Sequence, residues 1–328
     1  MRILVTGASG LLGLNLALEA ANQRIDSLEL GLLDLSSTST KHQVFAQVYN
    51  HPLNTSLFTV TQCDLTEPGA VERLIEQTQP DWVINCAALA IVDACEANPD
   101  QAKKLNIELP KKLAINVGRG GARLLHVSTD AVFDGKRGAY SETDTPNPLS
   151  VYGQTKLEGE IAVAEANPDA IIARVNFYGW SLSGTRSLSE FFFNNLQAGR
   201  KIMGFTDVYF CPLLVNTLAH IFLNMLGSGL SGLYHVVSSE CISKYDFGVA
   251  LAQQFELDKG LITPTSVEKA GLKAARSPNL TLRTDKLQKA LGTPLPGIAN
   301  GLKKYHTLYL QHYPQKLRSM ISRSTAHE

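Results

Sequence analysis

A tyrosine and a lysine one helical turn apart are the residues of this chain best suited to chemistry. Tyr152 and Lys156 stand in the segment Tyr-Gly-Gln-Thr-Lys, four residues apart, which places both on one face of a helix. A phenol has an ordinary pKa of about 10, and a nearby lysine ammonium would favour the phenolate. Such a tyrosine can exchange a proton with a carbonyl or an alcohol while hydride moves to or from a nicotinamide. Thr129, from the upstream Ser-Thr-Asp stretch, would hydrogen-bond and orient the same substrate oxygen.

A glycine-rich turn some 140 residues upstream supports the same chemistry. Gly7, Gly10 and Gly13 follow the apolar run Ile-Leu-Val with the spacing G-x-x-G-x-x-G. In such a turn the first glycine lets the chain leave the strand sharply, and the second lets the backbone approach a pyrophosphate at a helix N-terminus. The third lets helix and strand pack closely. Each motif alone is weak, but together they indicate a nicotinamide-dependent enzyme.

The elements around these motifs alternate, as in a doubly wound α/β fold with a parallel sheet. We expect strands at 2–6, 27–33, 57–62, 82–85, 124–128 and 171–175. Helices are expected at 11–22, 67–77, 100–117 and 150–166, and the mostly polar stretch 36–54 is expected to be an irregular loop plus a short element. We assign 1–176 and 201–242 to a dinucleotide-binding domain. A smaller substrate-binding lobe would comprise 177–200 and 243–310, and 311–328 would form a polar, mobile C-terminal tail.

Candidate ligand-binding residues follow the ends of the expected strands, where open parallel sheets bind ligands. In chain order they are Gly7, Asp34, Asp64, Ala87, Thr129 and Asn176. Asp34 would accept hydrogen bonds from the adenosine ribose and so favours NAD over NADP, although Ser36, Thr38 and Lys41 could instead admit a 2′-phosphate. Asp64 could meet the adenine amino group, cap the helix that follows, or do both.

The composition excludes several other classes of protein. The formal net charge is zero, so no electrostatic footprint for nucleic acid or an anionic membrane is expected. No membrane-spanning run and no signal-peptide pattern is visible, and the cytoplasm is the expected location. The five cysteines are odd in number and lack a C-x-x-C pair, which indicates neither a disulfide framework nor a metal site. Cys63 and Cys86 are expected to be core thiols.

Taken together, these segments resemble the extended short-chain dehydrogenases/reductases, and most of all the dTDP-4-dehydrorhamnose reductase family. The resemblance is carried by the glycine turn, by residues 83–88, by 128–135 and by 147–160, and more loosely by 279–287. It covers most of residues 1–176. It implies a Rossmann fold and an NAD(P)-dependent reduction of a keto group on a nucleotide-linked sugar, with a homodimer as a possible assembly.

The resemblance also implies a set of site residues. Thr129, Tyr152 and Lys156 would be catalytic, supported by Asn106, for which an ordinary place on a helix surface is the alternative. The cofactor would be held by Gly7, Ser9, Gly10, Leu11, Leu12, Gly13, Asp34, Asp64, Leu65, Cys86, Ala87, Ala88, Tyr152, Lys156 and Asn176. The substrate would be held by Val92, Thr129, Asp130, Phe133, Asn176 and Arg283.

Two segments on the substrate side depart from the family pattern, at 174–180 and at 204–213. They leave the cofactor chemistry intact and put the thymidine-linked substrate in question. The run Phe191-Phe192-Phe193 is expected to pack in the core rather than stack on a base. Two alternatives stay open: an epimerase or dehydratase of the same superfamily, and a cofactor-binding regulatory subunit that resembles the methionine adenosyltransferase β subunit.

Overall fold

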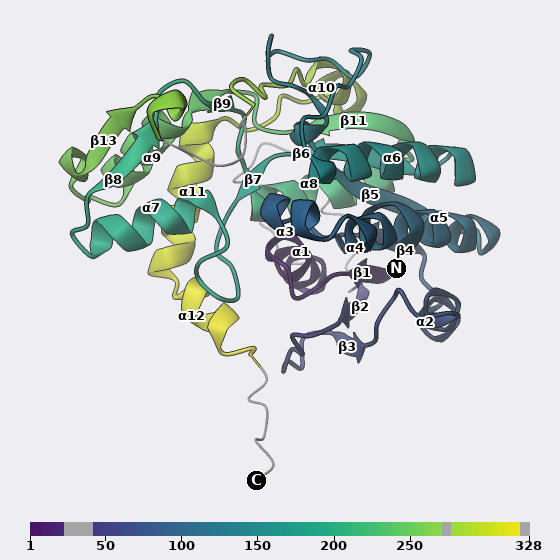
Figure 1. Cartoon of the computed structure of the whole chain (residues 1–328). Coiled ribbons are helices and arrows are strands. Elements are labelled where there is room, and N and C mark those ends of the chain that lie inside the picture. Colours follow the sequence, from purple (N-terminus) through teal and green to yellow (C-terminus); the bar gives the residue numbers. More distant parts are fainter. Residues whose placement is uncertain (23–41, 271–276, 322–328) are drawn as a thin grey trace.

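A parallel sheet covered on both faces by helices forms the centre of the molecule (Figure 1). The computed structural model describes residues 1–22, 42–270 and 277–321. Within these residues the sheet has seven strands in the order β11-β6-β5-β4-β1-β2-β3, every pair parallel. The strands are β1 (Arg2–Thr6), β2 (Gln43–Val48), β3 (Thr59–Gln62), β4 (Trp82–Asn85), β5 (Arg123–Thr129), β6 (Ile171–Val175) and β11 (Gly232–Val236). The order reverses between β1 and β4, where doubly wound folds bind their ligands. The predicted fold class is confirmed.

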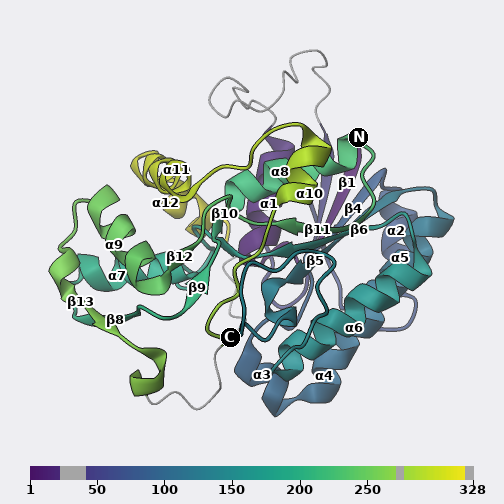
Figure 2. The same ribbon diagram turned by 90° about the horizontal axis from the view of Figure 1, so that it is seen from above.

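The period of the strands explains why both faces of the sheet are covered. Successive side chains of a strand point to opposite faces. In β1, Ile3 and Val5 pack with α1 (Leu11–Ala21) and α8 (Val215–Gly227), whereas Leu4 packs on the other side. That side is covered by α2 (Ala70–Thr78), α5 (Leu109–Arg119) and α6 (Val151–Ala166), as Figure 2 shows. A strand buried on both faces reads as a continuous apolar run, which is why β1 could be predicted.

A smaller lobe lies beside the carboxyl ends of the strands (Figure 2). It contains α7 (Leu188–Gln197) and α9 (Lys244–Gln254), with β8 (Ile202–Phe205) paired to β13 (Ile262–Thr265). Two further short pairs are β9 (Tyr209–Phe210) with β12 (Ile242–Ser243), and β7 (Phe177–Tyr178) with β10 (Leu213–Leu214). Thus 202–205 pairs with 262–265 and not with the central sheet. The domain limits stay a prediction.

Short helices complete the chain. They are α3 (Val92–Ala97), α4 (Pro99–Lys103), the π-helical turn η2 (Lys104–Glu108), the 3₁₀ turns η3 (Asp130–Val132), η4 (Lys259–Leu261) and η5 (Val267–Ala270), α10 (Asp285–Leu291), α11 (Ile298–Leu310) and α12 (Tyr313–Arg318). None of the helices in the described ranges is long and apolar enough to cross a membrane.

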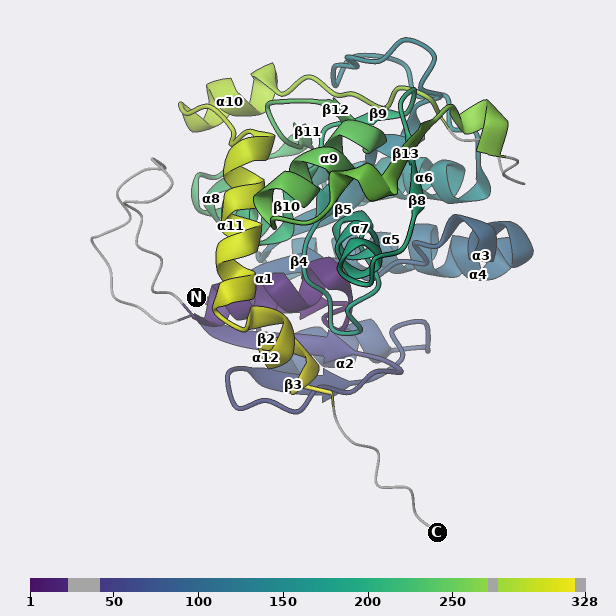
Figure 3. The same cartoon turned by 90° about the vertical axis from the view of Figure 1, so that its left-hand side faces the viewer.

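Several expectations from the sequence differ from the structure. The stretch 36–54, expected to be a loop plus a short element, contains β2, a strand of the central sheet and the direct neighbour of β1. The strand expected at 27–33 and Asp34 lie outside the described residues. The first part of the C-terminal tail is the helix α12, and Leu317 and Met320 are buried, so the chain runs from α11 down to β2 and β3 (Figure 3). Cys211 and Cys241 form a disulfide bond across the end of the β9–β12 pair. Cys63 and Cys86 are only half-buried, and the buried free thiol is Cys95.

A glycine sets the distance between α6 and the π turn, and this close contact can be tested. A Cβ added to Gly159 would overlap the carbonyl oxygen of Asn106, whereas one added to Gly118 would meet Asn167 at an ordinary 3.5 Å. In a helix, glycine to alanine normally stabilises by up to about 1 kcal/mol. We expect Gly118→Ala to follow that rule, and Gly159→Ala to lower the free energy of unfolding by ~1–3 kcal/mol through overpacking. Urea denaturation of both variants measures the difference, and two stabilising results would contradict the packing described.

Candidate active site

The glycine turn joins β1 to α1 at the carboxyl edge of the sheet. Gly7 has a positive φ of 64°, and a Cβ there would lie 2.8 Å from the Cα of Ala87, so only glycine fits. Gly10 is the N-cap residue of α1, has no side chain to cap it, and no acidic residue stands in the first turn. The N–H groups of Leu11, Leu12 and Gly13 therefore stay directed toward any group placed at this helix end. The turn suits an anion, as a dinucleotide pyrophosphate requires.

Tyr152 lies in the first turn of α6, and its hydroxyl is hydrogen-bonded to Thr129 at the end of β5. Burial raises the pKa of Tyr152 to about 12, and the Thr129 hydrogen bond offsets only part of that effect. The charges of Asp130 and Cys95 also raise this pKa, and the predicted activation of the phenol by Lys156 stays a prediction. Tyr152 is a protonated phenol at neutral pH.

Asp130 and Asn176 form a polar pair beside Thr129. The Asn176 amide donates to the Asp130 carboxylate over 2.6 Å, and the Thr129 hydroxyl donates to the other carboxylate oxygen over 3.1 Å. Asp130 is buried, and burial raises the pKa of its carboxyl to about 6, although hydrogen bonds and the charge of Lys244 act the other way. The predicted residues Thr129, Asp130, Tyr152 and Asn176 thus come together.

Lys156 lies on the same helix face as Tyr152, but its amine points into the sheet. The Nζ atom donates to the carbonyl oxygen of Val127 over 2.6 Å and lies 3.4 Å from Nε2 of His126. Lys156 is 2% exposed, and burial lowers the pKa of its amine to about 8 while the charge of Glu160 raises it. The lysine therefore carries an easily lost proton.

Asn106 lies buried in the π turn η2, not on a helix surface. Its amide exchanges two hydrogen bonds with the backbone of Leu89 and donates to the hydroxyl of Thr155 over 3.1 Å. Thr155 lies between Tyr152 and Lys156 on α6. Asn106 therefore supports the helix that carries both residues.

Gln47 of β2, the strand beside β1, contacts the glycine turn and was not among the predicted site residues. Gln47 of β2 accepts from the N–H of Gly7 over 3.0 Å and donates to the carbonyl oxygen of Cys63 over 2.8 Å. The residue after β2 is Tyr49, and Asp34, on which the predicted preference for NAD rests, lies outside the described residues. That preference stays a prediction. The sequence signal that could have identified Gln47 is a polar residue inside an apolar run, between Ala46 and Val48.

The other residues assigned to the cofactor surround the turn, with different side-chain environments. Asp64 accepts from the N–H and the hydroxyl of Thr66, so it caps the chain before α2, and Leu65 is in the core. Leu12 is also buried, whereas Ser9, Leu11, Cys86, Ala87 and Ala88 keep some exposure. Val92 begins α3, which packs against α6 and whose Glu96 accepts from the N–H of Val151.

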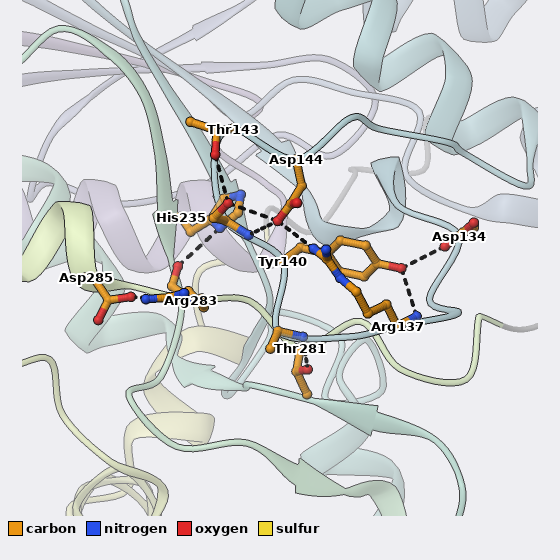
Figure 4. Close-up of polar contacts among 11 residues, drawn as sticks. Asp134, Arg137, Tyr140, Thr143, Asp144, His235, Thr281, Arg283 and Asp285 are labelled. Atoms are coloured by element: carbon orange, nitrogen blue, oxygen red, sulfur yellow. Dashed lines mark hydrogen bonds and ion pairs between the residues drawn. The ribbon is translucent and has the colours of Figure 1, made fainter.

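Two residues assigned to the substrate lie elsewhere. Phe133 is fully buried, stacked on Tyr140 with ring centroids 4.2 Å apart, and so offers no surface to a ligand. Arg283 is exposed and directed at Asp285, and its backbone carbonyl faces His235 (Figure 4). Phe133 is part of the core under segment 134–144 and its ring is withdrawn from the site, whereas a substrate contact of the exposed Arg283 side chain stays a prediction.

A pocket of about 450 Å³ opens in the small lobe between α7, β8 and α9. Its apolar wall includes Phe191, Phe192 and Phe205, and its charged groups are Lys201 and Lys244. Phe192 and Phe193 are core residues as predicted, but Phe191 is 45% exposed and lines this pocket. The charge of Lys244 also lowers the pKa of Asp130, so this wall of the pocket lies within electrostatic reach of the Asp130–Asn176 pair. The two lysines had no recognisable sequence signal.

The family model described as "RmlD substrate binding domain" matches residues 1–310. The chain belongs to this family. It is 35% identical over 245 residues to the probable low-salt glycan biosynthesis reductase Agl14 of Haloferax volcanii, covering 74% of this chain and 82% of that protein. It is 31% identical over 297 residues to the methionine adenosyltransferase 2 subunit beta of Danio rerio, covering 88% and 84%. A solved dTDP-4-dehydrorhamnose reductase from Clostridium acetobutylicum superposes with a TM-score of 0.78 at 30% identity, covering 94% of this chain and all of that one.

These likenesses confirm the resemblance to the extended short-chain dehydrogenases/reductases and the assignment to the oxidoreductases. Relatives named as reductases and relatives named as a regulatory subunit both lie in this family. The assignment of individual site residues rests on the geometry described above.

The buried Asp130 predicts a pH dependence of stability. Its folded-state pKa of about 6 lies above the ordinary 3.8, so the folded state binds this proton more tightly. Its contribution is therefore complete below pH 3.8 and is lost as the pH rises to about 6. In the parent protein, ionisation of Asp130 should lower the unfolding free energy by ~3 kcal/mol between pH 3.8 and about 6. In Asp130→Asn, whose amide stays neutral, we expect this loss to be absent. Denaturant titrations across the window measure it, with the exposed Asp93→Asn as control, and equal slopes in Asp130→Asn and the parent protein would refute the raised pKa.

Proposed function

We propose that this protein is an NAD(P)-dependent reductase of a keto group on a nucleotide-linked sugar, such as dTDP-4-dehydrorhamnose. The observation that carries the proposal is the hydrogen-bonded pair of Tyr152 and Thr129 at the carboxyl edge of the sheet, beside the glycine turn. Here a substrate carbonyl oxygen would meet both hydroxyls at once. The match to a family with named reductases supports the same reaction.

The residues at this edge fit a dinucleotide. The uncapped N-terminus of α1, with no acidic residue in its first turn, would hold the pyrophosphate. Gly7 and Gly13 let the turn lie close against Ala87 and the start of α1 close against the turn. Lys156 would bind the nicotinamide ribose. When bound, the reduced nicotinamide supplies the hydride. We leave the choice between NAD and NADP open, because Asp34 is not placed by the structure.

The protonation state of Tyr152 suits the direction of reduction. A carbonyl that receives hydride at its carbon needs a proton at its oxygen, and the Tyr152 phenol, with a pKa of about 12, still carries one. The phenol O–H bond breaks as the alcohol O–H bond forms, which leaves a tyrosinate that must regain a proton before the next turnover. Thr129 would hold the oxygen in line during this transfer.

The lobe pocket is the proposed place of the nucleotide. Its aromatic wall of Phe191 and Phe205 suits a base, and Lys201 and Lys244 suit a diphosphate. The influence of Lys244 on Asp130 supports an orientation with the diphosphate end toward Thr129 and Tyr152. Cytoplasmic residence and a homodimer stay predictions.

Removal of the Tyr152 hydroxyl tests the proposed chemistry. With reduced cofactor and dTDP-4-dehydrorhamnose, we expect Tyr152→Phe to lower kcat by about 100-fold or more, because general acid catalysis is lost. Fluorescence titration should show cofactor binding within a few-fold of normal. Tyr140→Phe is the matched control, since that hydroxyl donates to Asp134 and has no bond to Thr129 or Tyr152 (Figure 4).

The same assay separates the alternatives. Full activity in Tyr152→Phe would contradict the role of the phenol. Cofactor binding without turnover over a panel of keto sugar nucleotides would favour the regulatory reading suggested by the methionine adenosyltransferase relatives. Product formation without net cofactor oxidation would favour an epimerase or dehydratase.

Lys201 tests the proposed nucleotide position. We expect Lys201→Met to raise KM for the nucleotide sugar by about 10-fold, the loss of one charge-assisted hydrogen bond, with kcat and cofactor affinity unchanged. Lys259→Met, on the turn η4 outside the pocket, is the control. An unchanged KM in Lys201→Met would move the nucleotide out of this pocket.

A further inference from the structure

A row of buried polar side chains runs beneath the cleft from the glycine turn to Lys156. Thr6 of β1 donates to the Asn85 carbonyl oxygen over 2.6 Å, and the Asn85 amide nitrogen lies 3.0 Å from Nδ1 of His126. Nε2 of the same ring lies 3.4 Å from Nζ of Lys156. Thr6, Asn85, His126 and Lys156 are each at most 2% exposed. The row thus connects three adjacent strands to α6 without contact with water.

The order of donors in this row is fixed by a backbone N–H. The N–H of Ala87 can only donate, and it donates to the side-chain oxygen of Asn85 over 3.2 Å. The Asn85 nitrogen must therefore face His126, and because it is a donor, Nδ1 of His126 must accept. A neutral imidazole with an accepting Nδ1 carries its proton on Nε2. That N–H points at Lys156.

An N–H directed at Nζ suits an amine and opposes an ammonium. A neutral amine can donate to the Val127 carbonyl oxygen and accept from His126 with its lone pair, whereas an ammonium sets donor against donor. The other titratable groups that act on Lys156 are Glu160 of α6, which favours the ammonium, and Cys86 at the end of β4. His126 is therefore the neighbour on β5 whose hydrogen-bond polarity acts against the charge.

We propose that His126 is a positioning residue for Lys156: the chain from the Ala87 N–H through Asn85 fixes the Nε2–H tautomer, and this N–H holds the lysine nitrogen in place and weakens its hold on the third proton. The inference rests on the proposed function only for the statement that Lys156 serves the cofactor. It links the strand end at the glycine turn to the protonation of the lysine.

Two further observations agree with the proposal. Burial and the charge of Lys156 keep the pKa of His126 well below 6.5, so the ring is neutral and has a single N–H to direct. Burial brings the pKa of the Lys156 amine down to about 8, so both forms of the amine occur near neutrality. In either form the amine keeps an N–H that can donate to a ribose hydroxyl beside the one that bonds Val127.

The tautomer can be measured in the unaltered protein. A long-range proton–nitrogen correlation spectrum of ¹⁵N-histidine-labelled protein should show His126, identified by its absence in His126→Phe, with Nδ1 unprotonated and Nε2 protonated. The opposite pattern would overturn the proposal. This measurement needs no turnover, so it stands or falls separately from the reductase function.

The effect on Lys156 is measured by ¹³C NMR of protein labelled at lysine Cε, with the signal identified by its loss in Lys156→Met. We expect a titration midpoint near 8 in the unaltered protein. It should rise by about one pH unit in His126→Phe, as the loss of one hydrogen bond to a buried group implies. His126→Gln, whose amide can donate in place of Nε2–H, should restore it.

His235→Phe is the matched control, because His235 is an equally buried strand histidine that faces the Arg283 carbonyl and not Lys156 (Figure 4). It should leave the midpoint unchanged. An unchanged or lowered midpoint in His126→Phe, or an equal shift in His235→Phe, would overturn the proposal.

Discussion

A buried ion pair holds α6, the helix of Tyr152 and Lys156, to the sheet, and the geometry of the candidate site depends on it. Glu160 of α6 accepts two hydrogen bonds from Nε of Arg174 on β6 and one from its guanidinium end, and Ser128 of β5 donates to the same carboxylate. Arg174 and Glu160 are 2% and 4% exposed. Removing one partner of such a pair strands a charge in the interior and costs about 3–5 kcal/mol. Because Glu160 lies one turn beyond Lys156, it sets how α6 meets β5 and β6.

The contacts of Glu160 explain why Thr129 and Asn176 lie close to the residues of α6. Ser128 precedes Thr129, and Arg174 lies two residues before Asn176, so one carboxylate fixes the ends of two strands and the helix opposite them. The polar groups that result are removed from water, and their proton affinities move accordingly: upward for Tyr152 and Asp130, downward for Lys156. A protonated phenol and a weakly basic lysine are what a proton-donating reductase site needs at neutral pH.

Elements could be predicted from the sequence where a local residue pattern determines the structure. β1 carries a continuous apolar run, the glycine turn has its own spacing, and α6 carries Tyr152 and Lys156 four residues apart. Prediction of a strand failed at β2, where Gln47 interrupts the apolar run and is tolerated only because Gly7 and Cys63 satisfy its amide. The disulfide was missed because Cys211 and Cys241 meet only through the pairing of β9 with β12, which no spacing reveals.

The place of Asn106 in the structure depends on a proline four residues further along the chain. Pro110 has no N–H to give the carbonyl four residues earlier, which is that of Asn106, and the helix widens there into a π turn. The widened turn places the Asn106 amide between Leu89 and Thr155. Pro110 lies inside the helix expected at 100–117, and its consequence depends on how closely Gly159 lets α6 approach.

The central claim is that hydride passes to a sugar carbonyl at the Tyr152–Thr129 pair. Its most direct test is incubation of the purified protein with dTDP-4-dehydrorhamnose and reduced cofactor deuterated in turn at each face of nicotinamide C4, followed by mass spectrometry of the sugar product. We predict that one of the two labelled cofactors transfers deuterium to carbon in a product with a new hydroxyl group. A protein that binds the cofactor yet transfers deuterium from neither face, to this or any other keto sugar nucleotide, would contradict the account.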